Sequence, residues 1–288
     1  MTQRAILWKG AAPRRRWHWR RALVWLILIA TTIVALFPMY WLFVSALTPT
    51  KYTINTTPRF FPDPLGFDNF QRLFALATDY WRWFLNSLIV ALSVTVFHVI
   101  FDTMAGYAFA KRRFPGRNLM FWLILSTLMI PAHVTLVPLY IVTRELKLLD
   151  TLLAVILPGT ANVFGIFLMR QYIQTMPGEL IEAGRIDGAN EFGIFWRIIL
   201  PLCKPAIAAL AIFTFVRHWN DFLWPLIVLT RSRNFTLPVG VASLQGEFST
   251  DYGVIFAGAA LAALPMIIFF LIFQRYFLEG VRMGAVKG

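Results

Sequence analysis

Thiol and imidazole side chains are scarce in this chain of 288 residues. Its one cysteine, Cys203, has no second cysteine with which to form an internal disulfide bond. The four histidines, at positions 18, 98, 133 and 218, do not have ligand-like spacing with that cysteine. The sequence therefore predicts neither an internal disulfide bond nor a metal site.

Motifs for nucleotide binding and for covalent catalysis are also absent. The chain has no Gly-x-x-x-x-Gly-Lys-Ser/Thr loop, whose backbone N–H groups and lysine would hold nucleotide phosphates. It has no Gly-x-Ser-x-Gly or His-Glu-x-x-His motif and no paired-carboxylate constellation. We therefore expect a protein that is not an enzyme, has no catalytic residues and binds no cofactor of its own. The energy for any work that it does must then come from elsewhere.

Charged residues are scarce as well, and much of the chain consists of long apolar runs. Charged residues make up 14% of the chain and apolar residues 58%, which is too apolar for a soluble globular domain. A helix needs about 20 residues to cross a hydrocarbon core, and continuous runs lack the alternation of barrel strands. We predict an all-α integral membrane protein with six transmembrane helices, the fourth extending to about residue 169. The apolar blocks are 22–47, 84–110, 119–142, 152–167, 206–230 and 254–273.

The lysines and arginines divide unequally between the two sides that this topology creates. With the N-terminus placed in the cytoplasm, 18 of the 27 fall on the cytoplasmic side, 8 fall on the other side, and Arg217 lies within a helix. Cytoplasmic loops of membrane proteins carry such an excess. We predict that residues 1–21 form a basic cytoplasmic tail, that 22–288 form a single transmembrane domain in the cell (inner) membrane, and that both termini are cytoplasmic. The net charge of +13 then suits anionic lipid headgroups rather than nucleic acid, because the basic residues are spread over short loops.

A polar insert at residues 176–203 separates the fourth and fifth apolar blocks, on the predicted cytoplasmic side. Pro177 and Gly178 break the preceding helix, and Glu179 and Glu182 favour the start of a new one. Gly188 permits a turn at its end. We predict a short helix across the cytoplasmic mouth, with a small apolar face made by Leu180, Ile181, Ala183 and Ile186. Such a helix could dock in a groove on a partner protein or rest on lipid headgroups.

The insert carries a recognisable motif. Glu182-Ala183-Gly184, Gly188 and Ile198-x-Leu200-Pro201 resemble the EAA loop of binding-protein-dependent ABC importer permeases. Gly184 departs from the usual alanine, which lowers helix propensity by about 1 kcal/mol. The resemblance implies a coupling helix that sits in a cleft of an ATPase subunit. It assigns ATPase coupling to Glu182, Ala183, Gly184, Arg185, Asp187, Gly188, Leu200 and Pro201.

Further motifs make the chain similar to carbohydrate importer permeases of the maltose-permease type, over nearly everything after residue 48. They include Asn86-Ser87, Met129-Ile130-Pro131, the segment Trp219-Asn220-Asp221-Phe222-Leu223-Trp224-Pro225 and the C-terminal Gly284-Ala285-Val286-Lys287-Gly288. The resemblance implies a sugar substrate, a second permease subunit in a heterodimer, and an extracytoplasmic solute-binding protein. It also implies two ATPase subunits, which would hold the ATP and magnesium.

Polar residues within the fifth apolar block are candidates for a translocation path: Arg217, Trp219, Asn220, Asp221 and Trp224. Arg217 and Asp221 are four residues apart, so they would share one face of a helix. Aromatic rings can stack on sugar rings and polar groups can bind hydroxyls, but buried polar groups also serve packing. Both interpretations remain open.

His98 and Asp102 form a second pair four residues apart, in the second apolar block. A satisfied structural pair or part of a proton relay would both use these residue types. The proton relay belongs to an alternative function, a self-sufficient ion-coupled secondary transporter or channel. Such a protein does not need the polar insert, and the sequence shows no internal repeat of the kind found in many secondary transporters.

Overall fold

The computed structural model describes residues 18–53, 60–160, 162–245 and 251–285, and most of the predicted basic tail therefore lies outside the described residues. The described chain is helical and contains no strand, which confirms the all-α prediction. Its elements are α1 (His18–Leu47), α2 (Thr50–Thr53), α3 (Asp68–Leu76), α4 (Tyr80–Lys111), α5 (Arg117–Ser126), η1 (Thr127–Met129), η2 (Ala132–Thr135), α6 (Leu136–Glu145), α7 (Leu152–Ile156), η3 (Leu157–Gly159), α8 (Val163–Gln174), α9 (Glu179–Ile186), α10 (Glu191–Ile194), η4 (Phe195–Ile199), α11 (Leu200–Leu202), α12 (Lys204–Trp219), α13 (Leu223–Val228), η5 (Ser232–Asn234), α14 (Leu237–Ala242) and α15 (Tyr252–Ala285).

Helix α4 is the centre of the bundle, because α8 and α12 both pack along it. Its long apolar sequence favours one uninterrupted helix of 32 residues, which ends at Lys111 where Arg112 turns to extended backbone. Val90 and Val94 on α4 and Met169 on α8 are almost fully buried. Burying such side chains stabilises helix contacts by close packing, which in lipid replaces the hydrophobic driving force. The second predicted span is thus the scaffold on which the fourth and fifth are placed.

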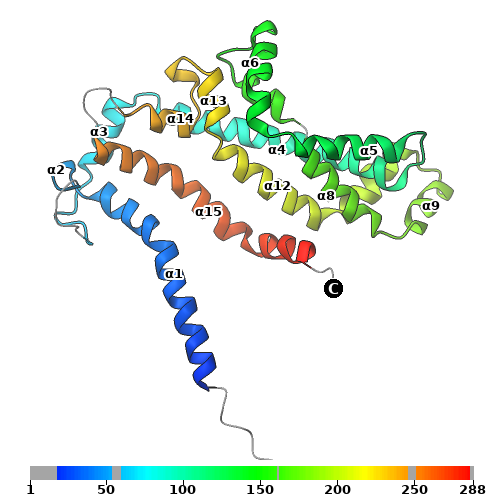
Figure 1. Ribbon diagram of the computed structural model, residues 1–288, viewed down its shortest axis with the longest axis horizontal. Helices are drawn as coiled ribbons and strands as arrows, with labels where there is room; N and C mark the ends of the chain where they lie inside the picture. The colour runs from blue at the N-terminus through cyan, green and yellow to red at the C-terminus, as the bar shows by residue number, and fades with distance from the viewer. Residues whose placement is uncertain (1–17, 54–59, 161, 246–250, 286–288) are drawn as a thin grey trace, which may run out of the picture.

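Helix α1 is exposed over most of its length. Figure 1 shows it leaving the body of the molecule as an arm, with only its C-terminal part beside α15. None of its apolar membrane window is buried within the chain, and Trp25, Leu26 and Val34 are among its exposed side chains. An apolar helix of this kind must be covered by lipid or by another subunit.

Two of the predicted spans are bent. The third consists of residues Arg117–Met129 and Ala132–Glu145 at an angle of 94°. Pro131 causes the break, because proline lacks a backbone donor and holds the preceding Ile130 in extended conformation. Among the residues that the structure describes, four helical segments have the length and composition of membrane spans, and the number rises to six if each of two bent pairs is one span. Membrane helices are therefore confirmed, while the exact number of six and the orientation remain predictions.

The fifth predicted span, 206–230, is also interrupted. Helix α12 ends at Trp219, and α13 begins only at Leu223. The 16 residues of α12 extend over about 24 Å, less than a hydrocarbon core of about 30 Å. At its other end, Glu191–Leu202 meets Lys204–Trp219 at 79°. The prediction of one continuous helix over 206–230 was therefore wrong, since Asn220 to Phe222 are not helical.

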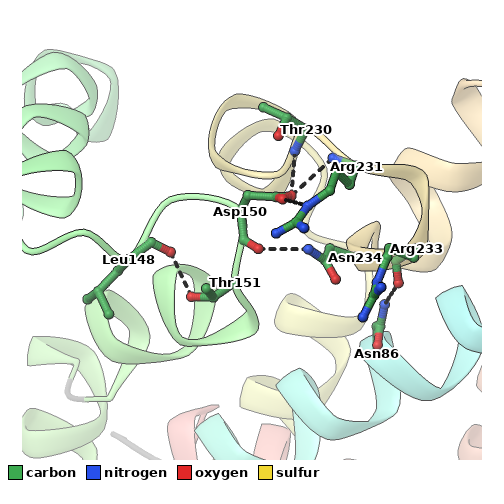
Figure 2. Close-up of polar contacts among 8 residues, drawn as sticks. All are labelled: Asn86, Leu148, Asp150, Thr151, Thr230, Arg231, Arg233 and Asn234. Atoms are coloured by element: carbon green, nitrogen blue, oxygen red, sulfur yellow. Dashed lines mark hydrogen bonds and ion pairs between the residues drawn. The ribbon is translucent and has the colours of Figure 1, made fainter.

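A polar cluster joins the loop between α6 and α7 to the segment after α13 (Figure 2). The Asp150 carboxylate accepts hydrogen bonds from the backbone N–H groups of Thr230 and Arg231, both at 3.0 Å. The backbone carbonyl of Asp150 accepts a further hydrogen bond from the Asn234 side-chain amide at 2.7 Å. Burial alone would raise the pKa of Asp150, but these donors and the Arg231 guanidinium outweigh it and leave the pKa well below its usual range. The carboxylate therefore stays ionised and keeps the two loops together.

The Asn86-Ser87 motif serves this same region. The Asn86 side chain donates to the carbonyls of Arg233 and Phe235, at 3.1 and 2.9 Å. The Ser87 hydroxyl accepts the backbone N–H of Leu237 at 2.7 Å. These bonds satisfy backbone groups that a break between helices leaves unpaired. The motif is therefore explained by structure: it fastens the segment before α14 to the start of α4.

Candidate functional site

The predicted helix and glycine turn of the polar insert are both present. Helix α9 covers Glu179–Ile186, and Figure 1 shows it at the opposite end of the molecule from α2 and α3. Gly188 has a φ of 79°, a left-handed conformation that glycine adopts without strain. The Gly188 N–H donates to the carbonyl of Arg185 at 3.0 Å, and the Ala189 N–H donates to the carbonyl of Gly184 at 2.9 Å. This pair of bonds is the Schellman arrangement, which ends a helix and satisfies its last carbonyls.

The faces of α9 differ from the prediction. Ile181 is buried, 4% exposed, and packs in a cluster with Ile194 and Ile199. Ile186, in contrast, is 85% exposed. The predicted apolar face was therefore wrong for Ile181, which points into the chain, whereas Leu180, Ala183 and Ile186 are exposed.

Gly184 lies on the buried side of α9. A Cβ atom at this position would come within 2.6 Å of Cδ1 of Ile198, the end of a flexible side chain. The glycine that departs from the usual motif thus brings α9 close to η4, and an alanine would require the Ile198 side chain to move.

The predicted coupling residues occupy two places. Glu182, Ala183, Arg185, Asp187 and Gly188 are exposed on α9 and its turn. Leu200 and Pro201 lie in α11, at the bend before α12, where Leu200 packs against the buried cluster around Ile199. The bend of 79° at this point turns the insert away from the fifth span. The first group can meet a partner directly, whereas the second sets the angle at which the insert leaves the membrane helices.

The structure adds one residue that the sequence interpretation missed. Glu191, at the start of α10, accepts hydrogen bonds from the Tyr107 hydroxyl at 2.9 Å and from Nε of Arg185 at 3.1 Å. It also forms an ion pair with Arg112. The sequence signal at this position, an acidic residue after the helix-capping Asn190, indicates only the start of a helix.

Two adjoining cavities lie beside α4 and α12, the first against α8 and the second against α6 and α13. Their volumes are about 280 and 270 Å³, and they share His98, Asn162, Arg217 and His218 as lining residues. The second cavity is also lined by His133, Asp221 and Trp224. Among the described residues, no hydrogen bond or ion pair is made by the Arg217 guanidinium. Its charge acts through space on the Asp221 carboxylate. A charged residue that lines a cavity within a predicted membrane span marks a candidate functional position.

The five predicted path residues are not brought together. Arg217, Asp221 and Trp224 line the second of these cavities. Trp219 and Asn220 line a separate, largely apolar groove of about 930 Å³ between α1, α14 and α15. Trp219 is only 2% exposed and contacts Phe215 and Phe84, with ring centroids 5.8 and 5.6 Å apart. Its surroundings are those of a core residue.

The predicted pairing of Arg217 with Asp221 on one helical face was also wrong. Helix α12 ends at Trp219, so Asp221 lies beyond it. None of the ion pairs among the described residues joins these two side chains. The Asp221 carboxylate instead interacts with the backbone N–H groups of Phe222 and Trp224, at the start of α13. Its hydrogen bonds are thus local, while the Arg217 charge acts on it across the cavity that the two side chains share.

The predicted contact between His98 and Asp102 is confirmed. His98 Nδ1 lies 2.9 Å from Asp102 Oδ2, and the two side chains are 3% and 0% exposed. The other His98 nitrogen contacts the carbonyl of Gly159, and the Asn162 N–H bonds to Asp102 Oδ1 at 3.3 Å. A Cβ atom on Gly165 would lie 1.9 Å from Asp102 Oδ2. The pair therefore ties α4 to the break between α7 and α8, and its close packing requires a glycine at 165.

Comparison with known proteins decides the family. Residues 102–283 match the family described as the binding-protein-dependent transport system inner membrane component. The chain belongs to this family. It is therefore a permease subunit of an ABC importer and a multi-pass inner membrane protein.

Curated relatives of this permease cover almost its whole length. It is 40% identical over 271 residues to the arabinooligosaccharides transport system permease protein AraQ of Halalkalibacterium halodurans, covering 92% of this chain and 97% of that one. The AraQ protein of Bacillus subtilis is also 40% identical, with 91% and 94% covered. The sn-glycerol-3-phosphate transport system permease protein UgpE of Salmonella typhimurium is 35% identical, with 88% and 93% covered. These relatives favour the importer over the alternative of an ion-coupled secondary transporter.

A solved structure shows the same fold. A chain of a bacterial ABC transporter involved in the import of the acidic polysaccharide alginate superposes with a TM-score of 0.82. The superposition covers 93% of this permease and 100% of that chain, at 24% sequence identity. The overall fold of this permease is therefore shared with a chain of that transporter.

Proposed function

We propose that this permease imports a sugar or sugar-like solute, delivered by an extracytoplasmic binding protein and moved through a heterodimer with a second permease. Two separate ATPase subunits hold the ATP and magnesium. The names of the relatives support this substrate class: arabinooligosaccharides and sn-glycerol 3-phosphate are both rich in hydroxyl groups. The absence of a phosphate-binding loop from the sequence supports ATP hydrolysis on other subunits.

The coupling role rests on one observation above all. Helix α9 ends in the Gly188 turn and leaves Ile186 85% exposed at the predicted cytoplasmic end. An exposed isoleucine beside the charged Arg185 and Asp187 suits the centre of a docking surface that a partner groove covers. When the ATPase subunits close, they push α9, and the membrane helices change from one access state to the other. Closure drives the change only because the two states bind the ATPase differently.

Replacing Ile186 with glutamate tests this docking. A buried, unpaired carboxylate would weaken the contact with the ATPase. Tagged Ile186→Glu is expected to co-purify with the second permease but to lose most of the ATPase, as measured by quantitative mass spectrometry of the complex extracted in mild detergent. Leu146→Glu is the matched control, because Leu146 is 62% exposed on the predicted external side. Undiminished ATPase recovery with Ile186→Glu would contradict the proposal.

The cavities beside Arg217 form the proposed solute path within this subunit. Trp224 donates its ring N–H to the carbonyl of Ala154 at 2.9 Å, which fixes the indole in the cavity wall. Arg217 can donate hydrogen bonds to hydroxyl oxygens, the Asp221 carboxylate can accept them from hydroxyl groups, and His218 can do either. Trp219 and Asn220 lie outside this path, in the groove along α15.

The substitution Asp221→Asn tests the path. It keeps the size of the side chain and removes its charge, so the contacts with the N–H groups at 222 and 224 are retained through the amide oxygen. We expect a complex of normal composition whose uptake of labelled arabinotriose or sn-glycerol 3-phosphate falls severalfold in proteoliposomes. A complex that falls apart would instead assign Asp221 a structural role.

A further inference from the structure

The Glu191 carboxylate binds side chains from two parts of the chain that are far apart in the sequence. Its Oε2 accepts the Tyr107 hydroxyl at 2.9 Å, and its Oε1 accepts Nε of Arg185 at 3.1 Å. The Arg112 guanidinium is ion-paired with the same Oε1. Arg185 belongs to α9, whereas Tyr107 and Arg112 lie at the end of α4. A single side chain thus connects the coupling helix to the second predicted span.

The position of Glu191 is well defined by its neighbours. Asn190 caps the short helix α10, with its side chain accepting the N–H of Gly193 at 2.7 Å. Ile194, one turn further on, is fully buried in the cluster that also contains Tyr107 and Ile181. The backbone of Glu191 is therefore anchored between α9 and α4, and its carboxylate completes the connection.

The magnitude of these contacts argues against a role in stability alone. The Glu191 and Arg112 side chains are 40% and 41% exposed. Exposed ion pairs contribute about 0–1 kcal/mol to folding, because solvent screens them. Three donors from two elements nevertheless share this one carboxylate, and a marginal gain in stability would not require such an arrangement. The geometry is better suited to keeping α9 and α4 in register.

The cluster is charged under cytoplasmic conditions. Partial burial alone would raise the pKa of Glu191, but the hydrogen bonds from Tyr107 and Arg185 and the charges of both arginines outweigh it, so the pKa is lowered. The lowered pKa keeps the carboxylate ionised at neutral pH, where it balances one of the two guanidinium charges. The connection is therefore permanent rather than pH-gated in the physiological range.

Helix α4 also reaches the proposed solute cavities. His98 lines both cavities and lies nine positions before Tyr107 on the same uninterrupted helix, a distance of about 14 Å. Helices α8 and α12, which supply several of the other lining residues, pack along α4. A displacement of the Tyr107 end of α4 therefore moves the wall of the cavities.

We propose that Glu191 is a positioning residue that transmits the movement of α9 to α4, and through α4 to the solute cavities. This inference rests on the proposed function, since it assumes that an ATPase pushes α9. Without the Glu191 carboxylate, α9 can still dock on the ATPase, but its movement is only loosely passed to the membrane helices. ATP is then hydrolysed with little transport.

The test compares Glu191→Gln with Glu179→Gln in the complete complex, reconstituted in proteoliposomes with its second permease, ATPase and binding protein. Glu179 is an exposed acid on α9, in the same polar insert, and no ion pair among the described residues includes it. Uptake of labelled arabinotriose, or of sn-glycerol 3-phosphate if the wild type prefers it, is measured together with phosphate release. Glu191→Gln is expected to lower uptake per ATP by about 5-fold or more, the lower end of typical coupling between sites, with ATPase activity retained. Glu179→Gln is expected to match the wild type.

Tyr107→Phe provides an independent check, because it removes one hydrogen bond to Glu191 and leaves both arginines in place. It is expected to lower uptake per ATP by a smaller factor. Wild-type uptake per ATP in Glu191→Gln would overturn the inference while leaving the importer function intact. Failure of the Glu191→Gln complex to assemble would also overturn it, since the role would then be structural. Absence of ATP-driven uptake of either solute by the wild-type complex would overturn the proposed function itself.

Discussion

Gly188→Val is expected to lower ATP-driven uptake by about tenfold or more while the permease remains in the membrane. Gly188 has a φ of 79°, and a Cβ atom there would meet nothing within 4 Å. The substitution therefore acts on the backbone alone. The left-handed conformation costs an ordinary residue about 1–2 kcal/mol, and a β-branched residue more. The two hydrogen bonds that end α9 would be lost, and Ile186 would no longer be presented to the ATPase.

A loss of this size corresponds to at least about a tenfold decrease in productive coupling. The measurement is uptake by the reconstituted complex, alongside the amount of permease in the membrane fraction. Gly178→Val is the matched control, because Gly178 lies in the same insert, has an ordinary φ of −67° and also has open space around its Cβ position. Gly116→Val is a second control, since Gly116 has a φ of 76° but lies in another loop. Normal uptake by Gly188→Val would remove the coupling role from this turn.

Removal of one partner from the buried His98–Asp102 pair in α4 is expected to lower the stability of the permease strongly, which is the second large effect. Asp102→Ala leaves His98, whose side chain is 3% exposed, without its carboxylate and opens a cavity beside Gly165. Breaking a buried pair in this way destabilises proteins by about 3–5 kcal/mol. We expect a marked decrease in the thermal unfolding temperature of the purified complex in detergent, measured by intrinsic tryptophan fluorescence.

Two variants separate this structural role from a proton relay. Asp102→Asn keeps the acceptor for the Asn162 N–H and is expected to lose much less stability than Asp102→Ala. The double substitution His98→Leu with Asp102→Leu removes both partners and is expected to recover part of the loss, because no uncompensated polar group remains. If Asp102→Asn is fully stable but makes uptake independent of a proton gradient, the relay interpretation is correct and the structural one is wrong.

Much of the site could be predicted because its determinants are local. Continuous apolar runs require helices in lipid, whatever surrounds them. Pro177 and Gly178 end one helix, and Gly188 ends the next through its own backbone freedom. A left-handed turn depends on a single residue, so it can be recognised from that residue and its spacing. The same holds for the phosphate-binding loop, a local motif whose absence could be read directly from the sequence.

The bends and the partners of polar groups could not be predicted in this way. The end of α12 at Trp219 separates Arg217 from Asp221, although their spacing fits a helix. Trp219 is drawn into a core with Phe84 and Phe215, while Trp224, five residues later, faces a cavity. Each of these outcomes depends on contacts with residues far away in the chain, which spacing along one segment does not contain.

The sequence by itself determined a helical membrane permease with a short helix in a polar insert, because hydrophobicity and single-residue backbone preferences act locally. Only the tertiary structure decided which side chains meet across elements. It placed Ile181 inside and Ile186 outside on the same helix. It also brought Glu191 within hydrogen-bonding distance of Tyr107, 84 positions earlier. The physical reason is that helix packing sets the distances between elements, and an isolated acid in a sequence carries no record of the donors that folding will bring to it.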